Sequence, residues 1–339
     1  MTQIRSFIAR LPIDPYLLFL LGTVALAALL PARGGGTAMA DVAVYLAVAL
    51  LFFLYGARLA PSAVWSGIAH WRLQSLVFGS TFVLFPLLGI MVGRLAGPFL
   101  PHDIVVGLVY LCLLPSTVQS SIAFTAIARG NVPAALCSAS VSNLAGIVMT
   151  PVLVSLVLPA TGIGLSGHAL IDIALQILLP FLLGQAARPW IGEWLLDHRT
   201  LTSVVDRGSV LLVVYAAFSA GMVAGVWKQL SLHDLAAVLA LDLAILALVI
   251  GATTTASRRL GFSTPDEIAI VFCGSKKSMA GGIPMAAILF PGHAVGLIVL
   301  PLMLFHQAQL FVCATLARRY DARTSDRPGR SLSDAPVLA

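Results

Sequence analysis

Two adjacent lysines stand in the middle of an apolar segment, in the stretch VFCGSKKSMAGGIPM. These residues, Lys276 and Lys277, have about ten apolar or small residues on each side. An ammonium group at the centre of a bilayer costs about 2.5–3.5 kcal/mol on insertion scales. Such a pair needs a charged partner, a hydrated cavity or the loss of its protons. Its position deep in the apolar segment indicates a functional site rather than two side chains that extend to the membrane interface. The neighbouring Ser275 and Ser278 belong to the same candidate site.

A carboxylate partner is available in the stretch ALDLAILALVIG, which contains Asp242. This aspartate is the only carboxylate clearly inside an apolar run. We therefore expect an ion pair, or a proton-sharing pair, between Asp242 and one of the lysines Lys276 and Lys277. The alternative is that Asp242 only anchors a helix.

A second polar cluster lies in LLPSTVQSSIAFTAIARGN. Its proline removes one amide donor and crowds the preceding turn, so an unwound stretch is expected there. Unwound backbone exposes carbonyls that bind cations, and the restarting helix presents an N-terminus that attracts anions. The alternative is that the hydroxyl groups bond back to their own helix. The candidate ligands are Ser116, Thr117, Gln119, Ser120 and Ser121.

A third group of small polar residues occurs in CSASVSNLAG, with Ser138, Ser140 and Asn143. Small residues in such a segment more commonly allow close helix packing. The Asn143 amide is the costliest of them to bury, so we expect it to line a site. His306 and Gln307, in LMLFHQAQLF, are weaker candidates, since a lone histidine is more often structural.

The composition requires a lipid environment around these residues. Apolar residues make up 59% of the chain, charged residues 10%, and the mean hydropathy is +0.98, whereas soluble domains carry about 25% charged residues. The apolar runs are continuous and about twenty residues long, which indicates spanning helices rather than barrel strands. The sequence thus predicts an all-α membrane protein with ten transmembrane helices. The expected spans are 16–30, 40–59, 73–95, 104–128, 132–158, 169–187, 205–226, 235–256, 267–289 and 294–316.

The distribution of basic residues predicts the orientation of these spans. Fifteen arginines fall in the loops and termini on the side of the N-terminus, against three basic residues on the other side. The positive-inside rule then places both termini in the cytoplasm of a multi-pass protein of the cell (inner) membrane. The net charge of +6 is a topology signal and gives no reason to invoke nucleic acid. The Arg-, Ser- and Pro-rich tail, 317–339, is expected to be a disordered cytoplasmic segment.

The ten spans divide into two halves of five, about 14–160 and 167–316. An odd number of helices in each half means that the second half inserts upside down. The fourth span of each half is interrupted by small and polar residues, PSTVQSS in the first half and CGSKKSMAGG in the second. Paired interrupted helices at equivalent positions indicate a transport site. The alternative is that Pro115 only kinks its helix and Gly274 only aids packing.

These segments also carry a family resemblance. PSTVQSSIAFTAIARGNVPAALCSASVSNLAGI, followed by FCGSKKSMAGGIPMAAILF, resembles the bile acid:sodium symporter family, most closely the branch that contains the seventh member of human solute carrier family 10. The resemblance runs from the first span to the tenth. It implies one transporter unit over 1–316, made of two inverted five-helix repeats. It also implies a panel domain of helices 1, 2, 6 and 7 and a core domain of helices 3–5 and 8–10, in which discontinuous helices 4 and 9 cross near the sodium and substrate sites.

Most sodium ligands of that family are replaced in this chain. Phe272 stands at the position of the helix 9 glutamate and Lys276 at that of the glutamine, with Lys277 at the asparagine that follows. The serine–asparagine pair of helix 4 falls on Ser121 and Ile122. Two lysines in these places argue against a two-sodium site.

Other sodium ligands of the family fall on residues of this chain that lack the ligand but carry, or lie next to, serine or threonine oxygens. The helix 5 serine and threonine fall on two alanines beside Ser138 and Ser140, and the helix 3 glutamine falls on Thr81. A sodium ion near Ser121 and Ser140 therefore stays open, as does proton exchange with Asp242. The lysines could instead serve as counter-charges for an anionic substrate.

The leading function is secondary active transport of a small organic anion across the lipid bilayer by alternating access, coupled to sodium or to protons. One alternative is a non-transporting membrane regulator on the same scaffold, and another is a cation/proton antiporter. The sequence contains no phosphate loop, HExxH or GxSxG motif, so neither an enzyme nor an organic cofactor is expected.

Overall fold

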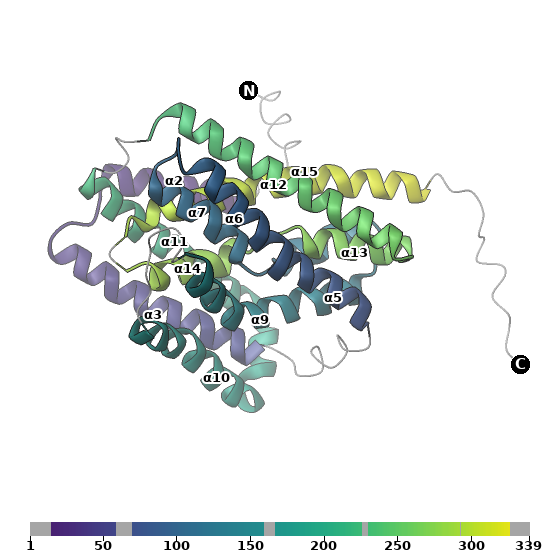
Figure 1. Ribbon diagram of the computed structural model, residues 1–339. Helices are drawn as coiled ribbons and strands as arrows, with labels where there is room; N and C mark the ends of the chain where they lie inside the picture. The colour runs from purple at the N-terminus through teal and green to yellow at the C-terminus, as the bar shows by residue number, and fades with distance from the viewer. Residues whose placement is uncertain (1–14, 59–69, 159–166, 226–229, 292, 326–339) are drawn as a thin grey trace, which may run out of the picture.

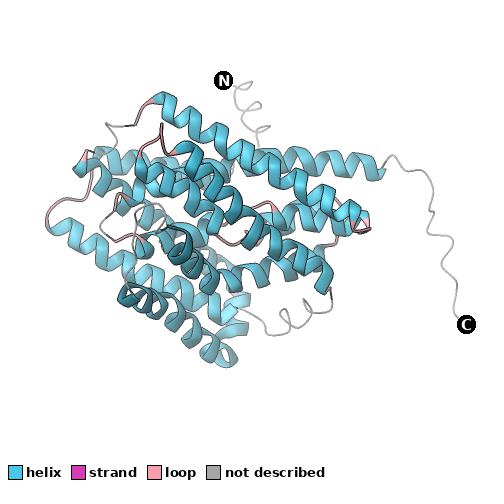
Figure 2. Ribbon diagram, in the orientation of Figure 1, coloured by secondary structure: helices cyan, strands magenta, loops and turns pink. Residues whose placement is uncertain are grey.

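Helices make up all the regular structure that the computed structural model describes, which covers residues 15–58, 70–158, 167–225, 230–291 and 293–325 (Figure 2). Within these ranges, six helical segments are long and apolar enough to cross a membrane. This agrees with the predicted all-helical membrane protein. The six segments are Gly35–Arg58, Trp71–Ala96, Val132–Val157, Thr200–Ala224, Leu232–Arg259 and Val295–Arg323.

The first half of the described chain contains one π-helical segment, η1, among its α-helices. Its elements are α2 (Pro15–Leu29), α3 (Gly35–Arg58), α5 (Trp71–Gly79), η1 (Ser80–Leu84), α6 (Phe85–Ala96), α7 (His102–Leu113), α8 (Gln119–Ile127) and α9 (Val132–Val157).

The second half is α-helical throughout its described residues. Its elements are α10 (Gly167–Asp197), α11 (Arg199–Ala224), α12 (Leu232–Arg259), α13 (Thr264–Gly274), α14 (Met279–Leu289) and α15 (Val295–Ser325). Both α10 and α15 continue well beyond the predicted ends of their spans.

The prediction of a disordered tail from residue 317 was wrong for 317–325, which continue α15. Two side-chain contacts and one buried residue hold this extension against α13 and the α8–α9 connection. Arg129 forms an ion pair with Asp321 at 2.7 Å, the Tyr320 hydroxyl donates to Glu267 at 2.8 Å, and Ala317 is buried. The rest of the predicted tail, 326–339, lies outside the described residues.

The predicted span 73–95 is interrupted by a π-helical turn that the sequence did not indicate. The amide of Phe85 donates to the carbonyl of Ser80, five residues back, instead of to that of Thr81. In this π pattern the next carbonyl, that of Thr81, would receive the amide of residue 86. Residue 86 is Pro86, which has no N–H. The Thr81 carbonyl is therefore left free for another donor.

The predicted interruptions are present at both places. In the range 104–128 the chain leaves helix after α7 and resumes at α8, and in the range 267–289 it breaks between α13 and α14. The ring of Pro115 packs on Gly146 of α9, where any side chain would overlap it. The amide of Ser278 donates to the carbonyl of Pro115 at 2.9 Å. The two breaks therefore meet at one place.

Helices α2, α3, α10 and α11 pack on one another. Gly56 and Gly184 let α3 and α10 cross closely, because a Cβ at either would overlap the backbone of the facing helix. Arg58 of α3 binds Asp206 of α11, and α2 packs along α11. Figure 1 shows α3 and α10 at one edge of the bundle and α12 at the opposite edge.

Candidate functional site

The end of α13 is covered by serine hydroxyl groups from other helices. A helix leaves its last carbonyls without intrahelical partners. The Ser121 hydroxyl donates to the carbonyl of Phe272 at 3.0 Å. The Ser116 hydroxyl donates to the carbonyl of Cys273 at 2.6 Å, and the Ser80 hydroxyl donates to the carbonyl of Gly274 at 2.8 Å. All three serines are buried. Ser116 and Ser121 thus bond across to the other broken helix, not back to their own.

The end of α7 is occupied by Lys277. Its Nζ donates to the carbonyls of Leu114 (2.6 Å), Cys112 (2.9 Å) and Thr81 (3.0 Å), and it lies 4.0 Å from the centre of the Phe85 ring. A nitrogen with three acceptors needs three N–H bonds, which only the protonated ammonium provides. The side chain is fully buried. Lys277 is therefore a cation held among backbone oxygens.

Lys276 points into different surroundings. Its Nζ lies 4.0 Å from the centre of the Phe124 ring and 5.6 Å from that of Phe272. It has no hydrogen-bond partner among the described residues, and it is also fully buried. Ring faces attract a desolvated cation by about 2 kcal/mol or more. Aromatic faces thus surround Lys276, where carbonyl oxygens surround its neighbour.

The predicted ion pair with Asp242 is not formed. Asp242 is fully buried, and neither carboxylate oxygen has a hydrogen-bond partner in the described part of the chain. The ammonium groups of Lys276 and Lys277 have the ring and carbonyl contacts given above. Carbonyls exposed by the end of α7 satisfy Lys277 without a carboxylate, which is the physical reason for the difference. Both lysine side chains are fully buried, so neither opens onto the hydrated cavity that the sequence allowed as an alternative.

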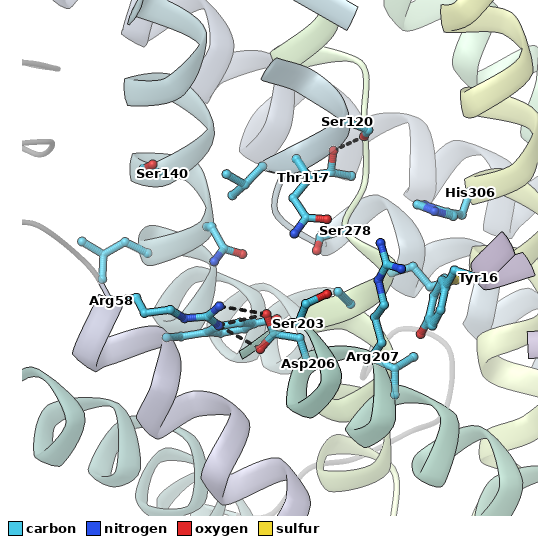
Figure 3. A pocket seen from close by; sticks show the side chains of 18 of the residues that line it. Tyr16, Arg58, Thr117, Ser120, Ser140, Ser203, Asp206, Arg207, Ser278 and His306 are labelled. Carbon is cyan, nitrogen blue, oxygen red and sulfur yellow. Dashed lines mark hydrogen bonds and ion pairs between the residues drawn. The ribbon is translucent and has the colours of Figure 1, made fainter. Parts of the chain in front are cut away.

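A cavity of about 380 Å³ lies beside the helix breaks (Figure 3). One wall comes from the α7–α8 break, α9, the start of α14 and α15, and the other from α2, α3, α10 and α11. Figure 3 shows polar side chains pointing into it from both walls. The structure thus brings together six of the predicted site residues, with His306 as a seventh. The six are Thr117, Gln119, Ser120, Ser140, Asn143 and Ser278.

Two helix N-termini face this cavity. Its lining includes the first-turn residues Gln119 and Ser120 of α8 and Met279 and Ala280 of α14. The first amides of a helix lack intrahelical acceptors, and the helix dipole is positive at this end. The opposite, negative ends of these broken helices are covered by other groups. Lys277 covers the end of α7, and Ser80, Ser116 and Ser121 cover the end of α13. The cavity, which the positive ends of α8 and α14 face, therefore favours a negatively charged ligand.

Three charged residues of the cavity were not predicted as site residues. Arg58 binds both carboxylate oxygens of Asp206 at 2.8 and 3.0 Å, so these two charges neutralise each other. Arg207 lies over the ring of Tyr16 at 5.4 Å and forms no ion pair with a described carboxylate. Among the described residues that line the cavity, Arg207 is therefore a surplus positive charge. The sequence analysis used Arg58 and Arg207 only as topology signals.

The remaining predicted residues lie elsewhere. Ser138 is buried and lines a second cavity of about 350 Å³ between α5 and α9, and Ser275 donates to a carbonyl of its own helix. Thr81 contributes its carbonyl rather than its hydroxyl. Ser121 faces α13 and Ser140 faces the main cavity, so the structure places the two residues of the expected shifted sodium site in different surroundings.

Sequence analysis also missed Gln309 of α15, which is fully buried and binds the backbone of Lys277. It additionally contacts the ring of His306 at 2.8 Å. A glutamine inside an apolar span was a usable signal, because an amide is costly to bury without partners.

A helical membrane protein whose interrupted helices meet beside a polar cavity has the architecture of a membrane transport protein. Comparison with known families agrees: the chain belongs to the SBF-like CPA transporter family, whose model matches residues 14–322. This confirms the resemblance to the bile acid:sodium symporter family and a transporter rather than an enzyme.

Relatives align over almost the whole chain. A Pseudomonas aeruginosa protein, "Uncharacterized protein PA2026", is 50% identical over 95% of this chain and 97% of its own length. The Escherichia coli K12 protein named "Putative symporter YfeH" is 47% identical over the same shares. Sodium/bile acid cotransporter 7 of Rattus norvegicus is 29% identical over 83% of this chain and 84% of its own.

Proposed function

We propose that this protein is a secondary active transporter of a small organic anion and that it works by alternating access. The observation that carries the proposal is the cavity in which Arg207 and the N-termini of α8 and α14 face one another. Arg207 supplies a surplus positive charge, and the helix ends supply free amide donors. An organic anion would neutralise the charge of Arg207 and accept hydrogen bonds from the free amides of the two helix ends.

The size and lining of the cavity support an amphipathic substrate. About 380 Å³ falls within the range of pockets for small organic ligands. Beside the polar groups, the lining contains the apolar side chains of Leu144, Ile147, Phe181 and Val210. We propose that the substrate anion binds near Arg207 while its apolar body packs on these side chains.

Hydrogen bonds within two separate groups of helices support movement of each group as a rigid unit. The pair Arg58–Asp206 joins α3 to α11, and Tyr215 joins α11 to the end of α2. The bonds of Ser80, Ser116, Ser121 and Lys277 join elements of the other group. We assign α2, α3, α10 and α11 to a panel domain and the remaining helices to a core domain. The cavity lies between the two.

The proposed topology has ten membrane crossings in two inverted repeats. The broken pairs α7–α8 and α13–α14 each count as one crossing, as do α2 and α10. Both termini then face the cytoplasm of an inner membrane. Because Arg58 ends α3 and Arg207 lies near the start of α11, the cavity in this conformation is on the cytoplasmic side.

The coupling ion is a proton or sodium, and Asp242 favours the proton. Its buried carboxyl group has no described partner, so it can gain or lose a proton without breaking a hydrogen bond. The same observation favours a second candidate function, exchange of a cation for protons. In that case the cavity would admit a cation in place of an organic anion.

Flux measurements in proteoliposomes test the proposal. A panel of labelled anions (taurocholate, a dicarboxylate and an aromatic carboxylate) is offered under an imposed proton gradient, a sodium gradient, or neither. We expect gradient-driven uptake of at least one anion. The variant Arg207→Ala should lower this uptake at least tenfold and Arg207→Lys should retain most of it, with Arg94→Ala as the control. Cation–proton exchange without uptake of any anion would replace the proposal with the second candidate.

A further inference from the structure

Three backbone carbonyl oxygens converge on one point at the end of α7. They belong to Thr81, Cys112 and Leu114, and the Nζ of Lys277 lies between 2.6 and 3.0 Å from each of them. The ring of Phe85 covers the same point at 4.0 Å. Carbonyls that replace the hydration shell of an ion, together with a ring face, are features of a binding site for a monovalent cation.

The backbone creates this site independently of the lysine. The Thr81 carbonyl is free because the π-helical turn would pair it with Pro86, which has no N–H. The Cys112 carbonyl would receive the amide of Ser116 in a continuous helix, but that amide donates to the Ser142 hydroxyl at 3.1 Å. The carbonyl of Leu114 belongs to the break itself. Each oxygen would be an unsatisfied buried acceptor without a cation.

We propose that these three carbonyls form a monovalent-cation site whose occupant is the protein's own Lys277 ammonium group. Only neutral oxygens and a ring contact the occupant, and this favours ammonium or potassium over divalent ions, which require carboxylates. The tether keeps the cation in place at every external ion concentration. The chain therefore needs no free sodium or potassium at this position.

The site also holds separate segments together. The ammonium of Lys277 bridges η1, the end of α7 and the α13–α14 break. Removing the Lys277 side chain should leave a cavity lined by three inward-facing carbonyls. It should also weaken the packing of η1 and the end of α7 against the α13–α14 break. A free cation that enters this cavity should restore the bridge. The inference concerns cation binding alone, so it does not depend on the transported substrate.

Thermal stability of the purified full-length protein tests the proposal. Wild type, Lys277→Ala and Lys276→Ala are melted in chlorides of N-methyl-D-glucamine, sodium, potassium, ammonium and methylammonium at equal ionic strength. Wild type should have the same Tm in N-methyl-D-glucamine, potassium, ammonium and methylammonium, while sodium is judged only by the difference between variants, because a coupling sodium would bind elsewhere. Lys277→Ala should melt lowest in N-methyl-D-glucamine and gain about 2–5 °C, saturably, with ammonium, methylammonium or potassium. Lys276→Ala should gain nothing, because no described carbonyl oxygen contacts the Lys276 ammonium group and ring faces alone do not replace a hydration shell.

The proposal would be overturned by a Tm of Lys277→Ala that is the same in all five salts, or by gains with potassium, ammonium and methylammonium that are as large in wild type as in Lys277→Ala. Lys277→Met covers the case in which the alanine variant does not fold. Methionine fills the space without a charge, so it should melt well below wild type in every salt. A Lys277→Met protein as stable as wild type would equally overturn the proposal, because the carbonyls would then need no cation.

Discussion

Gln309 holds the backbone of Lys277 through both ends of its side-chain amide. Its Oε1 accepts the amide N–H of Lys277 at 2.9 Å, and its Nε2 donates to the carbonyl of the same residue at 3.1 Å. The α13–α14 break leaves these two backbone groups without helical partners, and Gln309 supplies what a neighbouring helical turn would otherwise supply. The clamp fixes the point from which the Lys277 side chain enters its carbonyl site.

The substitution Gln309→Leu should therefore destabilise the protein strongly. It keeps a side chain of similar size but leaves a buried N–H and a buried carbonyl unpaired, each at a cost of about 1–3 kcal/mol. We expect a fall in Tm of several degrees. The matched control is Gln307→Leu, two residues earlier on the same helix and only half-buried, which should change Tm little. Equal melting of the two variants would contradict the structural role of the clamp.

A second prediction concerns Asp242. An ionised carboxylate without partners in an apolar interior is too costly to persist, so the neutral acid is the form that fits this conformation. Asparagine has the same shape as that acid. Asp242→Asn should fold with a Tm close to that of wild type, but its transport should lose the pH dependence of the wild type. The control Asp41→Asn, at an exposed position, should keep that dependence. An unchanged pH profile in Asp242→Asn would remove this residue from the coupling step.

Local sequence signals predicted the positions of the helix breaks. Pro115 cannot continue the helical hydrogen bonds, and Lys276 and Lys277 are too costly in an unbroken apolar helix. The partners of these groups could not be predicted in the same way. The oxygens around Lys277 are main-chain carbonyls, which every residue has, and Thr81 is exposed only through a π-helical turn.

Long-range pairs escaped the sequence analysis for a related reason. Arg58 and Asp206 are 148 residues apart in the sequence. Each of them, taken alone, has the sequence context of a charged residue near a membrane surface. Only the packing of α3 against α11 shows that they neutralise each other beside the cavity. The helical extension to Ser325 was missed similarly, since the arginine-rich tail has a disordered composition but finds Glu267 and Arg129 as partners.

The pair Arg58–Asp206 leads to a third prediction. Asp206→Asn removes the charge that neutralises Arg58, so stability should fall by about 1.5–3 kcal/mol, the usual size of a charged hydrogen bond. The freed guanidinium adds a second surplus cation to the cavity, which should lower the KM for an anionic substrate. The exposed Asp197→Asn serves as control. Exchanging the two residues, Arg58→Asp with Asp206→Arg, should recover stability. A KM that rises in Asp206→Asn would argue against an anion at this wall.

The contact between Gly146 and Pro115 gives the last prediction. A Cβ on Gly146 would lie 2.5 Å from two ring carbons of Pro115, well inside van der Waals contact. Gly146→Ala must therefore displace the proline, at a cost of about 1–3 kcal/mol. It should also displace the Pro115 carbonyl, which accepts the amide of Ser278. Both the Tm and the transport rate should fall.

The control for this effect is Gly251→Ala on α12, where nothing lies within 4 Å of an added Cβ. In a helix, replacing an unobstructed glycine by alanine stabilises by about 0.5–1 kcal/mol, so this variant should melt slightly higher than wild type. A matched pair of glycine substitutions with opposite effects would separate packing at the helix breaks from helix propensity. If Gly146→Ala also melted higher, Pro115 would be free to shift, and the breaks would not be held by this contact.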